Sequence, residues 1–343
     1  MPATDPSENG SNSAEVFEGS AQRPNPRQRR FKFSRIFAIC LAVAAVLTTV
    51  IRYWPRDGIQ ALAPIFYASP PAVSTGMAIL AWLLVRKRGR RLLKWSTGLL
   101  SVGLIALLIS DRPSHQQEPQ SLKLGFWNIA SGGLSWDGIT DRIKSWDAEI
   151  IGLAESNQNL RFDDLWVRRK YWLERFPGYN IVRFPRGMRL LSKYPAELVS
   201  EGKLGKGSNF GVAKLDVDGL PLYVVMADLL SHPTLPRAPS FDSLTEILAE
   251  LPEEAPVIVM GDMNTPARSI HLDTLRKTFR NTFEERGNGF YHSWPMPLPV
   301  LSLDQVWINK RIHVGSCELQ WTLHSDHRPM VCTLSLLTNK EIE

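Results

Sequence analysis

The sequence contains little cysteine and no internal repeat. Its 343 residues include three cysteines, Cys40, Cys317 and Cys332, whose spacings fit neither a zinc site nor a disulfide framework. No self-similarity appears at the periods of about 20 to 50 residues that characterise solenoids and propellers. Ordinary hydrophobic cores are therefore expected to hold the fold together, and the length favours more than one module at roughly 150 residues per domain.

The C-terminal part of the chain lacks an excess of positive charge. Residues 1–120 hold 15 Lys and Arg against 7 Asp and Glu, a net charge of +8. Residues 121–343 hold 25 Lys and Arg against 27 Asp and Glu, a net charge of −2. A duplex-binding surface normally needs surplus cations to neutralise phosphates. The charge of the C-terminal part therefore does not favour nucleic acid as its partner.

Three long apolar segments lie in the N-terminal third. They run from Ile36 to Ile51, from Ile59 to Val85 and from Leu92 to Ser110. Because a helix of about 20 apolar residues crosses a bilayer, residues 34–111 are predicted to form a membrane region with about three transmembrane helices. Residues 1–33, which begin with a stretch rich in Ser, Asn, Glu, Pro and Gly, are predicted to be a disordered cytoplasmic tail.

The basic residues between these segments predict an orientation. A basic run precedes the first segment, and Arg86 to Lys94 carry six Lys and Arg between the second and third. Basic loops stay in the cytoplasm, so the chain is predicted to be a multi-pass protein of the cell membrane with a periplasmic or extracellular C-terminal domain. Two alternatives are a cleaved signal peptide and a re-entrant second segment at Pro70-Pro71, which would turn the domain to the cytoplasm.

A different pattern begins after a polar linker at residues 112–120. Within residues 121–338, strand-like runs alternate with helix-like stretches, which predicts one α/β domain. The predicted strands are Leu122–Trp127, Glu149–Leu153, Tyr179–Phe184, Phe210–Val217, Leu220–Ala227, Val257–Gly261, Leu303–Ile308 and Met330–Leu336. The predicted helices are Gly138–Trp146, Asp164–Phe176 and Phe241–Leu251.

Polar residues cluster where the predicted strands begin or end. Four of them follow strand-like runs: Asn128, Glu155, Asp262 and Asn264. Asp304 and the pair Asp326-His327 lie near the start of the last two runs. Ligand sites of α/β folds form at such edges. A single residue of this kind is usually a turn former, but together they make a set of carboxylates, amides and one imidazole.

The segments that carry these residues resemble the endonuclease/exonuclease/phosphatase superfamily. The motifs occur in the order FWNIA, IIGLAES, GMRLLSKYP, VIVMGDMNTP, LDQVWI and SDHRPM. The resemblance implies a deoxyribonuclease-I-like α/β sandwich, here preceded by the transmembrane helices, and hydrolysis of phosphate esters. It covers residues 121–338.

The resemblance also implies a role for each residue. Glu155 matches the metal-ligand glutamate and Asp326 a second carboxylate near the metal, which is Mg²⁺ or Mn²⁺, cations that prefer oxygen ligands. Asn128 would orient that carboxylate or contact the phosphate of the substrate. Asp262 would position and deprotonate the attacking water, and Asn264 would donate a hydrogen bond to the phosphoryl oxygens.

The implied leaving-group machinery departs from the family pattern at one position. His327 matches the histidine that contacts the phosphate, and Asp304 the aspartate that holds its tautomer. The family normally has a histidine after the strand LPLYVVMA, whereas this chain has Asp228. An aspartate serves as a general acid only if its pKa is raised, and the nearby His232 is the alternative donor.

The predicted function is that of a membrane-anchored, divalent-metal-dependent phosphoesterase, with a phosphate ester as substrate and the bilayer as partner. A nuclease of the same superfamily is the first alternative, which the net charge does not favour. A binding module that kept the fold and lost turnover is the second, motivated by Asp228. The loop Phe290 to Pro299 precedes the Asp304 strand and is expected either to contact substrate or to pack beside the site.

Overall fold

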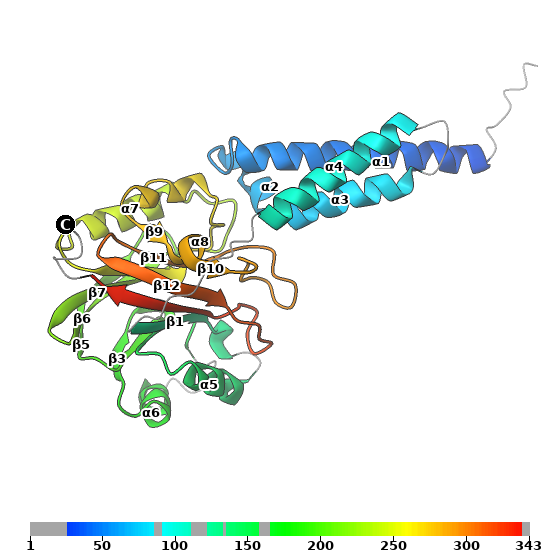
Figure 1. The fold of residues 1–343 in the computed structure, drawn as a ribbon. Coiled ribbons are helices and arrows are strands. Elements are labelled where there is room, and N and C mark those ends of the chain that lie inside the picture. Colours follow the sequence, from blue (N-terminus) through cyan, green and yellow to red (C-terminus); the bar gives the residue numbers. More distant parts are fainter. Residues whose placement is uncertain (1–25, 86–90, 111–121, 133–134, 158–164, 338–343) are drawn as a thin grey trace, which may run out of the picture.

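The computed structural model describes residues 26–85, 91–110, 122–132, 135–157 and 165–337 (Figure 1). Helix α1 (Pro26–Tyr53) begins inside the predicted tail, so the helical region starts eight residues earlier than expected. The rest of that tail and the predicted linker at residues 112–120 lie outside the described residues.

Two β-sheets form the C-terminal domain. Within the described residues, one sheet has the order β10 (Gly287–Asn288), β12 (Ile312–Leu319), β13 (Met330–Leu336), β1 (Leu122–Asn128), β2 (Ile150–Ala154), β4 (Arg189–Ser192), β3 (Asn180–Arg183). The other has the order β5 (Ala196–Lys203), β6 (Asn209–Val217), β7 (Leu220–Asp228), β8 (Val257–Asp262), β11 (Asp304–Ile308), β9 (Arg280–Asn281).

The two sheets stack, and helices cover their outer faces. Since side chains alternate along a strand, Phe126 of β1 points into the core between the sheets while Trp127 packs on the outer face. Helices α5 (Trp136–Ser145) and α6 (Leu165–Arg175) cover the first sheet, and α7 (Ala238–Ala249) covers the second. The short helix α8 (Thr282–Arg286) follows β9. The predicted α/β sandwich is therefore confirmed.

Strand direction brings the predicted site residues to one edge of the sandwich. Strands β1 and β2 run parallel, as do β7 and β8, so their carboxyl ends share an edge within each sheet. Strands β13 and β11 run antiparallel to β1 and β8, so both begin at that same edge. The register pairs Asp304 directly with Asp262.

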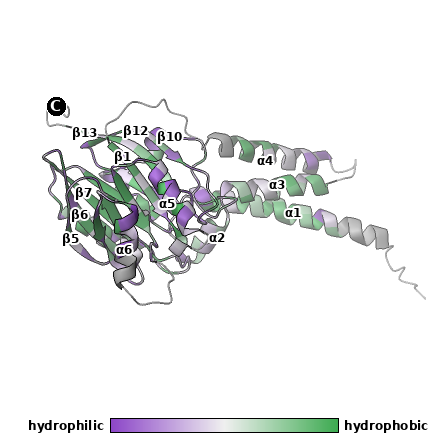
Figure 2. Ribbon diagram, turned by 90° about the horizontal axis from the view of Figure 1, so that it is seen from below, coloured by the Kyte–Doolittle hydropathy of each residue, from purple (hydrophilic) through white to green (hydrophobic). Residues whose placement is uncertain are grey.

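The N-terminal helices form a separate antiparallel bundle beside the sandwich (Figure 1). Helix α1 packs on α3 (Pro71–Leu84), which packs on α4 (Arg91–Ser110). The connection between α1 and α3, residues 54–70, contains the short helix α2 (Ala63–Ala68) and lies against the sandwich. Figure 2 shows hydrophobic residues along much of α1, α3 and α4.

The prediction of about three transmembrane helices is wrong for the described residues, of which only Phe33–Tyr53 is long and apolar enough to cross a membrane. The second predicted span fails because the chain stays extended at Pro70 between α2 and α3, and proline disfavours helix in the residue before it. Helix α3 then has 14 residues, about 21 Å at roughly 1.5 Å per residue. The side chains of α4 are described continuously only from Lys94 to Ala106.

The three cysteines are free thiols in this structure. Cys40 is exposed on α1, whereas Cys317 and Cys332 are buried. The register of β12 and β13 places Cys317 opposite Cys332, with the sulfur atoms 3.0 Å apart. The sequence spacing gave no indication of this contact, because it depends on how two strands pair.

Candidate active site

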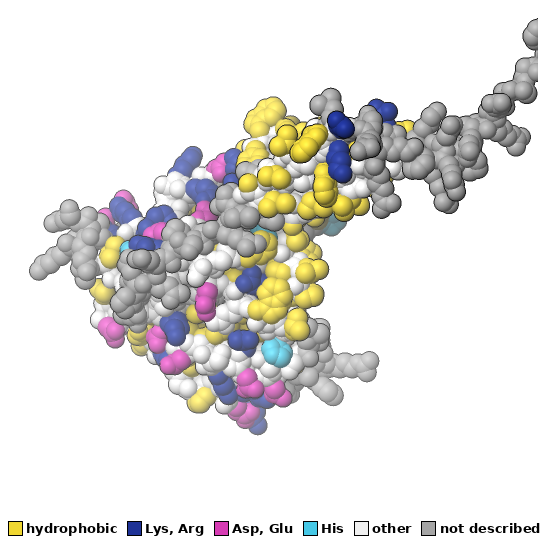
Figure 3. Space-filling model, turned by 45° about the vertical axis from the view of Figure 1, so that its right-hand side comes forward, with side chains coloured by type: hydrophobic (Ala, Val, Ile, Leu, Met, Phe, Trp, Pro, Cys, Tyr) yellow, Lys and Arg dark blue, Asp and Glu magenta, His cyan; other side chains and the backbone are white. Residues whose placement is uncertain are grey.

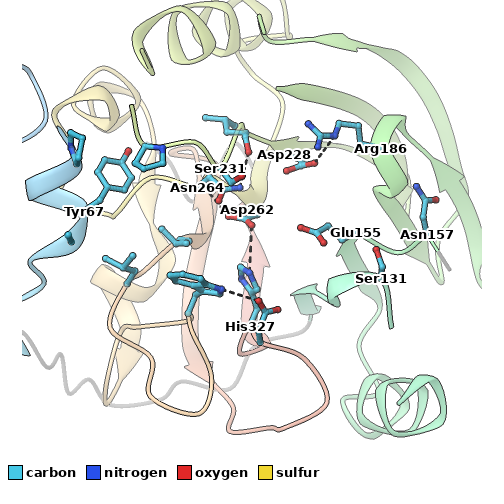
Figure 4. Close-up of a pocket in the computed structure, with 18 residues that line it drawn as sticks. Tyr67, Ser131, Glu155, Asn157, Arg186, Asp228, Ser231, Asp262, Asn264 and His327 are labelled. Atoms are coloured by element: carbon cyan, nitrogen blue, oxygen red, sulfur yellow. Dashed lines mark hydrogen bonds and ion pairs between the residues drawn. The ribbon is translucent and has the colours of Figure 1, made fainter. Parts of the chain in front are cut away.

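A pocket of about 690 Å³ opens at the edge where the predicted site residues gather (Figure 4). Its polar lining includes Glu155, Asp228, Asp262, Asn264, Asp326 and His327. Asn128 and Asp304 lie buried directly behind it, each hydrogen-bonded to one or more of these side chains. The structure thus brings together all the residues that the resemblance singled out.

Asn128 links the two sheets at the base of the pocket. Its amide nitrogen donates hydrogen bonds to Glu155 Oε1 at 3.1 Å and to Asp262 Oδ2 at 2.9 Å, and its amide oxygen accepts one from the backbone N–H of Ala130. Because the side chain is fully buried and these bonds use the amide, the geometry supports orientation of the two carboxylates rather than contact with a phosphate.

His327 is held in one orientation by Asp304. The Nδ1–H group donates to Asp304 Oδ2 at 2.7 Å, which leaves Nε2 4.0 Å from Asp262 Oδ2. Burial by itself lowers the pKa of His327, but the charge and hydrogen bond of Asp304 and the charges of Asp262 and Asp326 outweigh it and raise that pKa to about 10. The raised pKa favours the charged imidazolium at neutral pH, a form that attracts an anionic phosphate.

Asp262 has the properties of a base. Burial, chiefly, and the charges of Asp304 and Asp228 raise its pKa to about 7, against the opposing charge of His327 and the hydrogen bond from the Asn264 N–H to Oδ1. A carboxylate with a pKa near neutrality accepts a proton from water far more readily than one near pH 4. Its lone pairs toward Asn128 and Asn264 are occupied, which fixes its orientation.

Asn264 and Asp326 border the pocket from two loops. The Asn264 side chain donates one N–H to the carbonyl of Leu229 at 2.8 Å, and its second N–H remains for another acceptor. The Asp326 Oδ2 atom accepts a hydrogen bond from the indole of Trp294 at 3.1 Å. The Phe290 to Pro299 loop therefore does border the site, through Trp294.

Asp228, the departure from the family pattern, lies buried in the pocket wall. Burial raises its pKa to about 6, assisted by the charge of Glu155 and opposed by the charges of Arg186 and His327. The Nε atom of Arg186 is 3.8 Å from Asp228 Oδ2. The alternative donor, His232, is exposed and bonded to Thr234, while its neighbours Ser231 and Pro233 line the pocket.

Backbone strain is concentrated around the pocket. Ser131, Glu155, Arg186 and Asn264 line it and have positive φ angles between 46° and 56°, a region that non-glycine residues rarely adopt. Such residues cost free energy and persist where the surrounding structure enforces them, commonly at functional sites. The loops at this edge are thus shaped to present these side chains.

The oxygen ligands suit a hard divalent cation. Glu155 and Asp326 both present carboxylates to the pocket, and Asn128 holds the first of them in place. A second grouping, Asp262, Asp304 and His327, has potential ligand atoms within 4.8 Å of one another. In that grouping, however, Asp304 and His327 already bind each other. The Asp304 Oδ1 atom is buried without a hydrogen-bond partner among the described residues, and so contributes to the negative potential beside the pocket.

The structure adds pocket residues that the sequence analysis did not single out. Arg186 directly precedes the motif GMRLLSKYP, which was the available signal for it. Ser131, Asn157 and Ser231 follow motif strands within a few residues. Pro64, Tyr67 and Ala68 come from α2, outside the α/β domain, and no local pattern pointed to them.

Comparison with known proteins agrees with this geometry. The model of the Endonuclease/Exonuclease/phosphatase family matches residues 125–327, more than half of the chain. The human Nocturnin catalytic domain, solved with a bound sulfate anion, is 19% identical, with a TM-score of 0.50 over 66% of this chain and 97% of that one. An endonuclease/exonuclease/phosphatase family protein from Bacteroides thetaiotaomicron is 16% identical, with a TM-score of 0.50 over 66% and 99%. Curated proteins gave no significant match.

The family match, residues 125–327, includes every residue of the sandwich that lines the pocket. The solved structures share the fold at identities too low to indicate a substrate. Members of the family hydrolyse phosphate esters and generally use a divalent metal. This chain belongs to the endonuclease/exonuclease/phosphatase family.

Proposed function

We propose that this protein is a membrane-anchored, divalent-metal-dependent phosphoesterase whose catalytic domain lies on the exoplasmic side. The observation that carries the proposal is the pocket itself. It combines a buried carboxylate whose pKa is raised to about 7, a charged histidine held by Asp304, and an amide donor, all at one edge of the sandwich.

Each side chain then has a role in water attack on a phosphate ester. Asp262 orients the water and accepts its proton, while the His327 imidazolium and the free N–H of Asn264 face the phosphoryl oxygens, on which charge builds up. Asp228 donates a proton to the leaving oxygen when it is protonated. Glu155 and Asp326 would hold Mg²⁺ or Mn²⁺, which supplies Lewis-acid activation of the phosphate when bound.

The helical region supports membrane anchoring. The span Phe33–Tyr53 is 21 residues, about 31 Å long, which matches the hydrocarbon thickness of about 30 Å. Large apolar side chains of α1, α3 and α4 face outward, among them Phe37, Val43, Leu47, Leu83 and Leu99. Such exposure is costly in water and favourable in lipid.

The direction of α1 supports the orientation. Its C-terminal end adjoins the catalytic domain and its N-terminal end points away from it (Figure 1). If α1 crosses the membrane, its two ends lie on opposite sides, and the basic run Arg27 to Arg35 belongs to the far end. Basic flanks stay in the cytoplasm, so the catalytic domain is exoplasmic. A reporter fused after Glu343 and active only outside the cytoplasm tests this orientation.

Hydrolysis by the full-length protein in detergent tests the activity. Bis-p-nitrophenyl phosphate and p-nitrophenyl phosphate are assayed with Mg²⁺, with Mn²⁺ and with a chelator. We expect metal-dependent release of p-nitrophenol, lost in Asp262→Ala and His327→Ala. The matched control is Asp242→Ala, which removes an exposed aspartate of α7 far from the pocket. Equal activity in all these variants would overturn the proposal, and faster hydrolysis of single-stranded DNA would favour the nuclease alternative.

A further inference from the structure

The connection between α1 and α3 is bound tightly to the catalytic domain. Asp57 is buried and accepts hydrogen bonds from the Ser269 hydroxyl and the backbone N–H of Ile270. The guanidinium of Arg56 pairs with Asp273 through both carboxylate oxygens. These contacts join residues more than 200 positions apart in the sequence, so the position of the connection is specified by the fold rather than by the chain nearby.

Helix α2 of this connection forms one wall of the pocket. Tyr67 lies across the pocket from Glu155 and Asn157 (Figure 4). Its hydroxyl accepts a hydrogen bond from Arg237 Nε at 3.3 Å and lies 3.5 Å from the hydroxyl of Thr265, the residue after Asn264. The wall is therefore fixed against the loop that carries Asn264 and directly follows strand β8 with Asp262.

The lining of the pocket is divided by chemistry. Carboxylates and His327 make up much of its polar lining, whereas Pro64, Tyr67, Ala68, Leu229, Leu301 and Leu303 are apolar. Tyr67 of α2 lies across the pocket from Glu155 (Figure 4). Among the described residues that line it, Arg186 is the single Lys or Arg. A polynucleotide needs several cations for its successive phosphates, whereas a molecule with one phosphate region and one apolar region fits this division.

The apolar lining continues to the molecular surface near the helices. Leu298 is 77% exposed and belongs to the loop whose Trp294 and Leu301 line the pocket. Ile65 of α2 and Ile59 are also exposed. Figure 3 shows hydrophobic side chains continuing from the helical bundle onto the adjoining face of the catalytic domain. Contiguous apolar surface of this kind marks a site that contacts lipid or another apolar partner.

The position of α2 relative to α1 supports lipid as that partner. The wall residue Tyr67 follows the end of α1 by 14 positions, and the exposed aromatic residues Tyr53 and Trp54 lie at that end. Tyr and Trp are enriched at the boundary between hydrocarbon and water. With α1 in a bilayer, the mouth of the pocket lies close to the headgroup layer.

We propose that α2 forms the binding wall for the apolar part of an amphiphilic phosphate ester, a lipid whose phosphate reaches the catalytic carboxylates while its chains remain in the bilayer. The wall lies outside the family domain at residues 125–327, so this chain supplies it from its helical region. The inference rests on the proposed phosphoesterase activity and identifies the class of its substrate.

The test compares lipids with their own headgroups, using the full-length protein in phosphatidylcholine vesicles. The monoester pair is dioleoyl phosphatidic acid and glycerol 3-phosphate, and the diester pair is dioleoyl phosphatidylglycerol and glycerophosphoglycerol. We expect kcat/KM for one of the lipids to exceed that of its headgroup at least about tenfold, since burial of about two methylene groups already gives this factor.

A variant of the wall sharpens the test. Ala68→Trp fills the pocket at its apolar lining, and we expect it to lower kcat/KM for the lipid roughly tenfold while lowering that for p-nitrophenyl esters less than about threefold. The matched control, Val73→Trp, places the same side chain at an exposed position of α3 that does not line the pocket, and both activities stay unchanged. Retained activity on the chromogenic ester shows that Ala68→Trp folds.

The outcomes separate the two proposals. The amphiphilic substrate is overturned, and the phosphoesterase stands, if chromogenic esters are hydrolysed but kcat/KM is equal for a lipid and its headgroup. The same conclusion follows if Ala68→Trp lowers kcat/KM equally for the lipid and the chromogenic ester. Absence of hydrolysis of every ester with every metal overturns the phosphoesterase and the inference together.

Discussion

The helical region and the catalytic domain differ in where their large apolar side chains lie. In the sandwich, large apolar residues such as Trp127 and Trp307 are fully buried, and polar groups gather at one edge. In the helical bundle, large apolar residues face outward while small ones, Ala45 and Ala78, are buried between helices, and the Thr48 and Ser74 hydroxyls bind each other at 2.9 Å. Small and hydroxyl residues mediate helix contacts in lipid. The two regions therefore differ in the way expected if the bundle lies in lipid, as proposed, and the sandwich in water.

The largest effect is expected from the polar edge of the sandwich. Asp262→Asn removes the proposed base, and we expect kcat to fall about 10²- to 10⁴-fold. Since the folded-state pKa of this acid is raised from 3.8 to about 7, its titration destabilises the fold progressively as pH rises from 3.8 to about 7, with the full cost present above pH 7 and none below pH 3.8. The variant is therefore expected to have a higher Tm than the parent at pH 8 in chelator, and an equal Tm at pH 3.5.

A lysine on the outer face of the helical bundle tests whether that face contacts lipid. Val43 is exposed in the middle of α1. Val43→Lys adds about 2.5 to 3.5 kcal/mol to the cost of insertion, so we expect most of the protein to leave the carbonate-resistant membrane fraction. Leu220→Lys introduces the same charge at an exposed position of β7, where it changes stability by about 0.5 kcal/mol at most. Equal partitioning of both variants would contradict the interpretation that the bundle lies in lipid.

The contact between the two regions is expected to have an intermediate effect. Asp57→Ala leaves the buried Ser269 hydroxyl and the Ile270 N–H without their acceptor, which costs about 1 to 3 kcal/mol. Amide hydrogen exchange at Ile270 should become faster. Asp273→Ala removes only a partly exposed ion pair, worth about 0 to 1 kcal/mol. A smaller loss of Tm in the first variant than in the second would show that this contact does not join the regions.

The smallest expected effect concerns pH. Asp228 donates a proton only below its pKa of about 6, whereas the proposed base Asp262 is mostly ionised only above its pKa of about 7. The two effects offset each other between these values, so kcat for an alkyl phosphate ester falls about tenfold per pH unit only above about pH 7. Asp228→Asn removes this limb of the profile. Because the charge of Arg186 lowers the pKa of Asp228, Arg186→Gln moves the limb to higher pH. An unchanged limb in Asp228→Asn would assign the titration to another group.

The sequence predicted most of the long strands that are buried on both faces, although it missed the short buried strand β4. The continuous apolar runs that end at Asn128 and Asp262 became β1 and β8 with nearly the expected bounds. It missed β5, whose residues are largely exposed and whose ladder contains a bulge after Leu198, because an edge strand has no continuous apolar run. It also missed β12, interrupted by a bulge between Val314 and Ser316.

The site residues likewise divide into those that the sequence predicted and those that it did not. Residues directly after buried strands were predictable, since strand direction alone brings their side chains to one edge. Tyr67 was not predictable, because its place depends on contacts with Arg237 and Thr265, about 170 and 200 positions away. The three-helix prediction failed for a different reason. Pro70-Pro71 indicated a kink or a loop in the second apolar segment, but composition did not show that the helix after it would be only 14 residues long.

The docking of Arg56 and Asp57 has a kinetic consequence. The catalytic domain is joined to the helices twice, by the chain that follows α4 and by these noncovalent contacts of residues 54–70. Two attachment points suppress the pivoting that one tether allows, so, with α1 in a bilayer as proposed, the pocket stays at one height above it. If the substrate is a lipid, as proposed, encounter occurs by lateral diffusion in two dimensions, and the turnover rate follows the mole fraction of substrate in the surface rather than its bulk concentration.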